Sequence, residues 1–158
     1  MDAYEYLSVL NKEQREAVVH SGSPLLILAG AGSGKTRVIT TKIAYMISEL
    51  GINPYSILAV TFTKKAANEM QERAVLLEPQ AIKSQIRTFH SFGSWFLRRY
   101  AEQAGIDKNF TVYDDDDMVS LLLKEFPEMN RQQAGGVAHK ISRAKDYCLL
   151  PEDEDKFS

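Results

Sequence analysis

The segment of residues 24–37 constrains the fold of this chain more than any other. It reads Pro-Leu-Leu-Ile-Leu-Ala-Gly-Ala-Gly-Ser-Gly-Lys-Thr-Arg, so a short apolar run stands directly before a glycine-rich turn. Residues 25–28 show no polar alternation, which predicts a strand buried on both faces of a parallel sheet. Apolar residues at helical spacing after the turn predict a helix that ends near Gly51. The segment therefore predicts a strand, a tight loop and a helix, in that order.

The glycine-rich turn has the composition of a phosphate-binding loop. Its glycines allow a tight turn whose backbone N–H groups point inward, beside the positive end of the following helix. Lys35 is placed to reach the β- and γ-phosphates of a nucleotide, and the Thr36 hydroxyl to ligate the magnesium between them. An incidental lysine in a plain turn would not need this strand and helix on either side. The predicted loop residues are Ala29, which replaces the usual first glycine, Gly30, Ala31, Gly32, Ser33, Gly34, Lys35 and Thr36.

The composition is that of a soluble globular domain of 158 residues, with 44% hydrophobic and 25% charged residues. No apolar stretch is long enough to span a bilayer, and residues 1–5 lack a signal-peptide pattern, so we expect a cytoplasmic protein without a membrane partner. A net charge of -2 argues against a domain that coats nucleic acid by bulk attraction. Residues 1–112 carry 13 Lys or Arg against 10 Asp or Glu and are therefore net positive, whereas residues 113–158 are net negative, so any polyanion site is expected in the first part.

Two further strands are predicted at residues 57–62 and 84–88, and with the strand at 25–28 the first would form a right-handed βαβ unit. Each is followed by a polar turn, and ligands commonly bind at the carboxyl ends of parallel strands. Phe62 in the first turn could stack on an unpaired base. The alternative is a connecting loop with Thr63 as a helix N-cap and Phe62 in the core. Composition alone favours this alternative, and it favours a packing role for His90 in the second turn.

Three helices are predicted from capping and periodicity. Asn11 is the expected N-cap of the first, with Gln14 completing a capping box or, alternatively, reading a base edge with its amide. The second carries an aromatic stripe that is expected to lie in the core. The stripe consists of Phe92, Trp95, Phe96 and Tyr100. The third follows residues 114–117, four aspartates that suit a helix N-terminus better than a metal site. A fourth amphipathic helix is expected from Ala134 to Lys145.

Four segments together resemble the Q motif and motifs I, Ia and Ib of superfamily 1A DNA helicases of the UvrD, PcrA and Rep group. They are Gln14, residues 29–37, residues 61–70 and residues 87–91, and their order and spacing match. The resemblance implies an α/β fold: a partial RecA-like P-loop NTPase domain with a short parallel sheet, followed by an all-helical part. Residues 1–110 would begin motor domain 1A, and residues 111–158 would begin the helical subdomain 1B.

The resemblance also implies roles for single residues. Gln14 and Arg37 would contact ATP, while Lys35 and Thr36, as the catalytic pair, would serve the phosphates and Mg²⁺. These roles replace the packing interpretations of Gln14, Phe62 and His90. Lys64 stands where the group more often has asparagine, although a lysine still suits a phosphate. The residues that would face single-stranded DNA are Thr61, Phe62, Thr63, Lys64, Thr88 and His90.

Hydrolysis of ATP needs an acidic pair after a buried strand and an arginine opposite the γ-phosphate, and neither is apparent in the sequence. In the resembling group, these groups come from the rest of domain 1A and from domain 2A. The sequence therefore predicts an N-terminal piece of an ATP-dependent DNA helicase that translocates on single-stranded DNA and unwinds duplex in repair or replication.

This piece alone would lack hydrolysis. Its expected partners are single-stranded DNA, duplex junctions and the remainder of the same chain, namely the rest of 1A and 1B and domains 2A and 2B. The alternatives are a stand-alone module that binds nucleotide or single-stranded DNA without turnover, and a P-loop kinase or nucleotide sensor.

Overall fold

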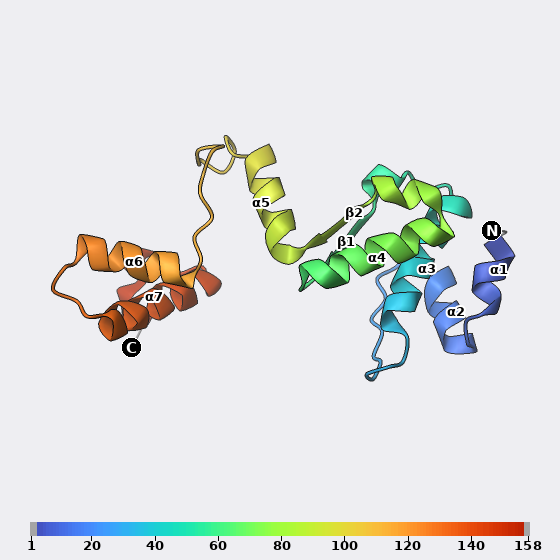
Figure 1. Ribbon diagram of the computed structural model, residues 1–158, viewed down its shortest axis with the longest axis horizontal. Coiled ribbons are helices and arrows are strands. Elements are labelled where there is room, and N and C mark those ends of the chain that lie inside the picture. Colours follow the sequence, from blue (N-terminus) through green and yellow to red (C-terminus); the bar gives the residue numbers. More distant parts are fainter. Residues whose placement is uncertain (1–2, 157–158) are drawn as a thin grey trace. The chain divides into compact units, whose positions relative to one another are not determined.

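A computed structural model describes residues 3–156, and Met1 and Asp2 at the amino terminus lie outside this range. The chain divides into two compact units, Met1–Gly105 and Ile106–Ser158 (Figure 1). The described residues are mostly helical, with one two-stranded parallel sheet. The first unit contains α1 (Ala3–Ser8), α2 (Lys12–Val19), α3 (Lys35–Ser48), η1 (Pro54–Ser56), β1 (Leu58–Thr61), α4 (Lys64–Leu77), η2 (Pro79–Lys83), β2 (Gln85–Thr88) and α5 (Phe89–Arg99). The second contains α6 (Asp115–Glu125), α7 (Arg131–Asp146) and η3 (Pro151–Lys156).

Helix α3 lies at the centre of the first unit because it buries side chains on two sides. On one side Val38 and Ala44 pack with α1 and α2, where Val18 is fully buried. On the other side Ile43 and Ile47 pack against α4, η2 and the residue before β1. This confirms the predicted helix after the glycine-rich turn. Lys35 is the first residue of α3. Because the core fixes α3, it also fixes the end of the glycine-rich turn that leads into this helix.

The two strands pair in parallel, and α4 connects them as the crossover of a βαβ unit. Leu58 lies opposite Gln85 and Thr61 opposite Thr88, so both strands end at the same level. This confirms the strands predicted at residues 57–62 and 84–88, with slightly shorter bounds. The loops that follow β1 and β2 therefore leave from one edge of the sheet.

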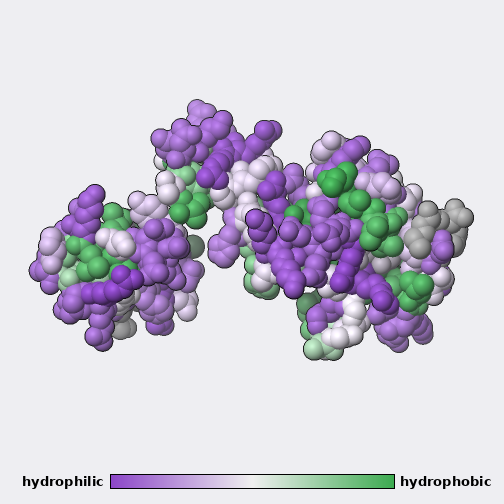
Figure 2. All heavy atoms as spheres, in the orientation of Figure 1, coloured by the Kyte–Doolittle hydropathy of each residue, from purple (hydrophilic) through white to green (hydrophobic). Residues whose placement is uncertain are grey.

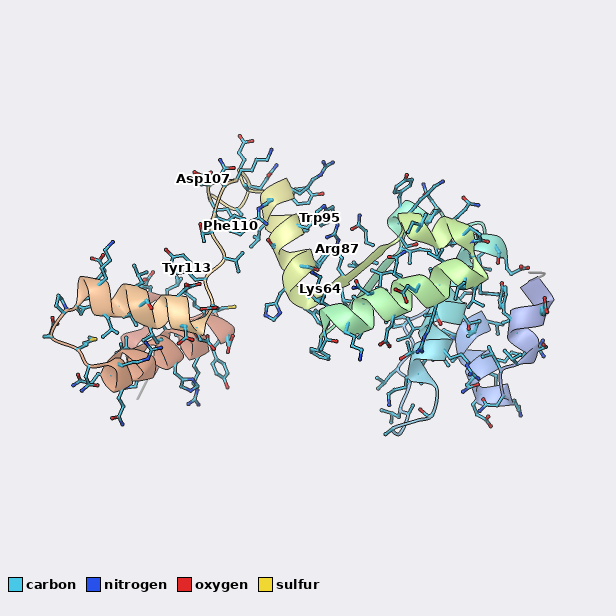
Figure 3. All side chains as sticks on the ribbon, viewed as in Figure 1. Lys64, Arg87, Trp95, Asp107, Phe110 and Tyr113 are labelled. Atoms are coloured by element: carbon cyan, nitrogen blue, oxygen red, sulfur yellow. The ribbon has the colours of Figure 1, made fainter. Side chains whose placement is uncertain are left out.

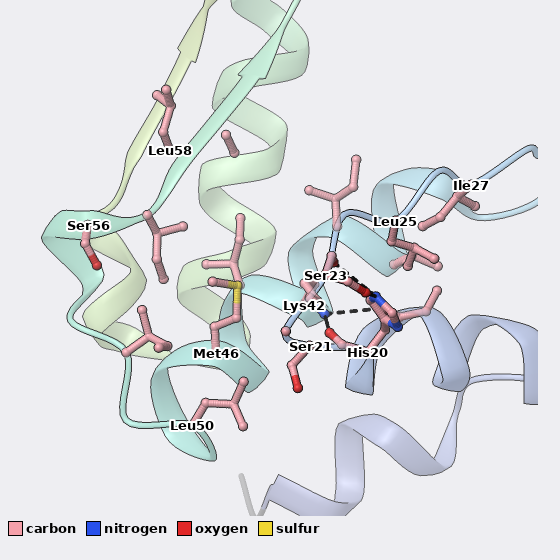
Figure 4. A pocket seen from close by; sticks show the side chains of 18 of the residues that line it. His20, Ser21, Ser23, Leu25, Ile27, Lys42, Met46, Leu50, Ser56 and Leu58 are labelled. Carbon is pink, nitrogen blue, oxygen red and sulfur yellow. Dashed lines mark hydrogen bonds between the residues drawn. The ribbon is translucent and has the colours of Figure 1, made fainter.

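The predicted strand at residues 25–28 is wrong, because the segment forms no strand and its side chains are exposed, up to 88% at Leu28. The βαβ unit expected from it is therefore also wrong. A strand needs a neighbour to pair its N–H and C=O groups, and within residues 3–156 β1 pairs with β2 only. A cavity of about 850 Å³ separates Leu25 and Ile27 from Leu58, with Met46 of α3 between them (Figure 4).

The aromatic stripe of α5 does not lie in a core, which corrects the sequence-based expectation. No residue of α5 is buried, and Phe96 and Tyr100 are 45% and 43% exposed. The stripe instead packs on itself, with ring centroids 4.7 Å apart for this pair. Trp95 receives the guanidinium of Arg87 over its ring at 5.6 Å, between β2 and α5 (Figure 3). The helix has few neighbours to cover it within the unit.

The second unit is a pair of helices, α6 and α7, in which each N-terminus has a capping box. Asp114 accepts a hydrogen bond from the backbone N–H of Asp117, and Asn130 does the same for α7. Arg131 donates to Asp116 at 2.7 Å and so joins the two helices. Of the aspartates of residues 114–117, Asp114 and Asp117 therefore cap α6, as expected. Among the described residues no group of three or more potential metal ligands is found.

The visible face of α4 is covered by hydrophilic side chains (Figure 2). No helix within residues 3–156 has the length and apolarity needed to cross a membrane. Location in the cell stays a prediction.

Candidate functional site

The glycine-rich turn folds into a compact loop at the start of α3. Gly32 and Gly34 have φ angles of 75° and 84°, which are left-handed values that other residues rarely adopt. The Ser33 hydroxyl donates to the carbonyl of Gly30 at 2.7 Å and closes the loop. The loop thus leads directly into the N-terminus of α3, where the first N–H groups of a helix lack partners within it and favour an anion.

Lys35 folds back over this loop. Its ammonium donates to the carbonyls of Ala29 at 3.0 Å and Gly30 at 2.8 Å. Arg37 and Arg73 add two further cations to the same site. The described residues that line its cavity include no carboxylate, whereas Glu13 lines a second cavity, of about 450 Å³, that also borders Lys35. The cavity beside the loop has a volume of about 390 Å³ and is lined by Gln14, Gly32, Ser33, Gly34, Lys35, Thr36, Arg37 and Arg73.

Gln14 joins α2 to the loop. Its amide oxygen accepts from the N–H of Asn11 at 3.1 Å, which confirms the capping box. Its amide nitrogen donates to the carbonyl of Ser33 at 2.9 Å. The two roles that the sequence left open are thus both compatible with this position, because the cap holds the amide at the edge of the cavity.

Replacing Gly34 with alanine should lower the free energy of unfolding by about 1–2 kcal/mol, because the residue is left-handed. A Cβ there would also lie 2.8 Å from the amide nitrogen of Gln14 and push it off Ser33. Urea denaturation followed by circular dichroism measures the change. Gly30→Ala is the matched control, since a Cβ at Gly30 meets nothing within 4 Å. Equal stability of Gly34→Ala and the wild type would contradict the loop geometry.

Lys42 of α3 contacts the C-terminal end of α2, whereas Gln14 lies near the N-terminal end of that helix. Its ammonium donates to the carbonyls of Ala17, at 3.5 Å, and His20, at the C-terminus of α2 (Figure 4). A cation is favourable there because the helix dipole gives the C-terminal end of a helix a partial negative charge. Burial lowers the pKa of Lys42 and raises that of Tyr6, whose hydroxyl bonds Ser48 at 2.8 Å. The contacts of Lys42 thus hold α2, the helix of Gln14, against α3, and the contact of Tyr6 holds α1 against α3.

The second group of predicted residues lies at the carboxyl ends of β1 and β2. Thr61 and Thr88 are paired across the sheet. Thr63 caps α4 by accepting from the N–H of Ala66 at 3.1 Å, as the sequence indicated. Phe62 is 86% exposed, so the interpretation that places it in the core is wrong. Threonine hydroxyls that accept in a cap keep a proton to donate to another group.

The remaining predicted residues flank this edge. Lys64 is the first residue of α4, and its side chain is exposed. His90 is exposed in the first turn of α5, so it is not a packed core residue. Thr88 caps that helix by accepting from the N–H of Ser91 at 3.1 Å. The structure therefore gathers all six predicted residues of this group around two helix N-termini.

Sequence reasoning missed two residues near these sites. Arg73 reaches the cavity of the glycine-rich loop from α4, where it also pairs with Glu69 at 3.8 Å. No local pattern marks it, because its position depends on how α4 packs on α3. Phe89 lies beside Phe62, with ring centroids 5.3 Å apart. A signal for Phe89 was present, since each strand ends in a threonine that a phenylalanine follows directly.

Comparison with known proteins identifies the family of the chain. Residues 10–158 match the UvrD/REP helicase N-terminal domain. ATP-dependent DNA helicase PcrA of Bacillus subtilis (strain 168) is 43% identical, over 98% of this chain and 22% of that protein. ATP-dependent DNA helicase PcrA of Staphylococcus aureus (strain Mu50 / ATCC 700699) is 50% identical, over 95% of this chain and 21% of that protein. The chain thus spans about a fifth of the length of these relatives. Since the family match covers nearly all of it, the chain belongs to the UvrD/REP helicase N-terminal domain family.

Proposed function

We propose that the chain is the ATP-binding part of an ATP-dependent DNA helicase and contributes half of its ATP site and part of its single-stranded DNA track. The observation that carries the nucleotide half is the cavity in which Gln14 of α2, Lys35 of α3 and Arg73 of α4 meet beside the glycine-rich loop. The family membership and the names of the relatives support the same function.

In the nucleotide site, the charge of the cavity suits a polyphosphate. Lys35 binds the β- and γ-phosphates. Its ammonium leaves the carbonyls of Ala29 and Gly30 and donates to anionic phosphate oxygens instead. This exchange is favourable because a hydrogen bond to an anionic oxygen is stronger than one to a neutral carbonyl. The Thr36 hydroxyl would hold Mg²⁺ together with the phosphates of ATP, and a single protein ligand would suffice because magnesium keeps waters and binds substrate phosphates. Bound Mg²⁺ would neutralise phosphate charge. Gln14 and Arg37 contact the rest of the nucleotide.

In the DNA site, unpaired bases and phosphates bind along the carboxyl edge of β1 and β2. Phe62 offers an exposed ring for stacking, and the hydroxyls of Thr63 and Thr88 donate to phosphates while they cap their helices. Lys64 supplies charge, and His90 extends the contact into α5. Thr61 lies at the end of β1 and orients Phe62.

Two exposed apolar surfaces of the chain support the proposed fold. We assign residues 1–110 to a RecA-like motor domain 1A and residues 111–158 to the start of subdomain 1B. Residues 25–28 and the aromatic face of α5 are apolar and exposed, as expected of surfaces that further parts of the same protein cover. In this proposal those parts are the rest of 1A and 1B and domains 2A and 2B, and the whole enzyme unwinds duplex at junctions.

Phe62→Ala is expected to weaken binding of a single-stranded oligonucleotide by about 1–3 kcal/mol, because one base loses its stacking partner. Binding by the wild type should be weak, because few cations face the strand, and it should be salt-sensitive and independent of sequence, because most contacts go to phosphates and to base faces. Fluorescence anisotropy of labelled oligonucleotides of two sequences, at several salt concentrations, measures all three properties. Unchanged affinity in Phe62→Ala would remove this residue from the DNA track.

A further inference from the structure

Phe62 and Phe89 form an exposed pair of aromatic rings at the carboxyl end of the sheet. Their centroids are 5.3 Å apart and their planes are inclined by 43°. Phe62 is 86% exposed and Phe89 is 50% exposed. Because phenylalanine is among the residues most often found inside a fold, two adjacent rings open to solvent indicate a surface that binds something.

The register of the sheet places the two rings side by side. Thr61 lies opposite Thr88, so the next residue of each segment leaves the sheet at the same level. Neighbouring strands are about 4.8 Å apart, which is close to the separation of the ring centroids. The caps formed by Thr63 and Thr88 fix the backbone directly beyond. Strand pairing and helix capping therefore preorganise the pair.

The surroundings of the pair fit a polyanion with flat apolar groups. Residues 61–66 include Lys64 and Lys65, and residues 87–91 include His90; neither segment contains a carboxylate. The side chains of Lys64, Lys65 and His90 are exposed. Cations and hydroxyls around exposed rings match the phosphates and the unpaired bases of a single strand, whereas an apolar protein surface would not use the charges.

We propose that Phe62 and Phe89 form a two-ring platform for an unpaired base of single-stranded DNA, which makes Phe89 a second aromatic DNA contact. The inference rests on the proposed function, which assigns the DNA contact to Phe62 and gives Phe89 no role. Because the rings are inclined, a base that stacks on one ring meets the edge of the other, an arrangement that aromatic groups favour.

The test compares two fluorescent probes of equal length: an oligothymidylate and an oligonucleotide in which the central bases are replaced by abasic sites. Anisotropy titrations at low salt use the 158-residue chain. Phe89→Ala is expected to weaken binding of oligothymidylate about fivefold or more, and binding of the abasic probe less than twofold. Phe89→Leu, which keeps apolar bulk without a ring, should behave like Phe89→Ala, whereas Phe89→Tyr should retain affinity.

Two further variants complete the design. The double variant Phe62→Ala/Phe89→Ala should lose less than the product of the two single effects, because the rings contact the same base. Tyr55→Ala is the matched control, since it removes an exposed aromatic residue before the amino end of β1 and should bind like the wild type.

The possible outcomes separate this inference from the proposed function. If Phe62→Ala binds weakly and Phe89→Ala binds like the wild type, the platform is overturned and the DNA track stands. If Phe89→Leu binds like the wild type, or if Phe89→Ala loses affinity for both probes equally, Phe89 has only a packing role and the platform is overturned. If the wild type binds neither probe, the DNA track and the platform fall together. Phe89→Leu tests the ring even where Phe89→Ala fails to fold.

Discussion

The purified chain is expected to hydrolyse ATP at no more than a thousandth of the rate of a complete helicase, with or without single-stranded DNA. In the proposed site Lys35 and Thr36 would hold the triphosphate and one side of the magnesium, but none of the described residues that line the cavity of about 390 Å³ beside them is a carboxylate that would position a water. Arg37 is assigned to the nucleotide itself, and Arg73 pairs with Glu69. An arginine supplied from outside is worth about 10³–10⁵ in rate. ATP binding and turnover should therefore separate.

Phosphate release from the purified chain measures this turnover, and Lys35→Ala serves as the control for contaminating ATPases. Turnover of several per second that depends on Lys35 and is stimulated by DNA would contradict the prediction. A catalytic acid would then exist within the chain, and the carboxylates of residues 114–117 would be the first to replace.

Replacing Lys35 with alanine is expected to weaken ATP binding by about 1.5–3 kcal/mol, which is roughly 10- to 150-fold. The ammonium donates to the loop carbonyls of Ala29 and Gly30, and in the proposed site it would turn to the β- and γ-phosphates. Its removal leaves Arg37 and Arg73 as the cations that line the cavity within the described residues, and neither of them donates to the loop carbonyls of Ala29 and Gly30 as Lys35 does. Isothermal titration of Mg·ATP into both proteins measures the loss.

Lys83→Ala is a matched control for this experiment. Lys83 is an exposed lysine of η2 that does not line the cavity, so its removal changes net charge without changing the site. The control should bind ATP like the wild type. Identical titration curves for Lys35→Ala and the wild type would show that the loop is not a nucleotide site.

Features set by a few neighbouring residues could be predicted from the sequence. The capping boxes of α2 and α6 are local, because Asn11 with Gln14, and Asp114 with Asp117, need only each other. The start of α3 after the glycine-rich turn follows in the same way. Here hydrogen bonds between residues three or four positions apart decide the structure, and the sequence shows these spacings directly.

Features that depend on distant partners could not be predicted. Residues 25–28 have the composition of a buried strand, but a strand requires neighbouring strands. In the first unit Leu25 and Ile27 instead line a cavity. The stripe of α5 has helical spacing, yet its burial depends on what covers Phe96 and Tyr100. The contact of Phe62 with Phe89 depends on the register of β1 and β2, which no spacing within one segment reveals.

The most direct test of the account maps both sites on one protein by ¹H–¹⁵N NMR. Addition of Mg·ATP should shift the amide signals of residues 29–37 and the side-chain amide of Gln14, which touches Ser33. Addition of oligothymidylate should shift a different set, centred on residues 61–65 and 88–91. Shifts from Mg·ATP that fall outside the loop, or a single set of signals that responds to both ligands, would contradict an ATP site at α3 and a separate DNA edge at β1 and β2.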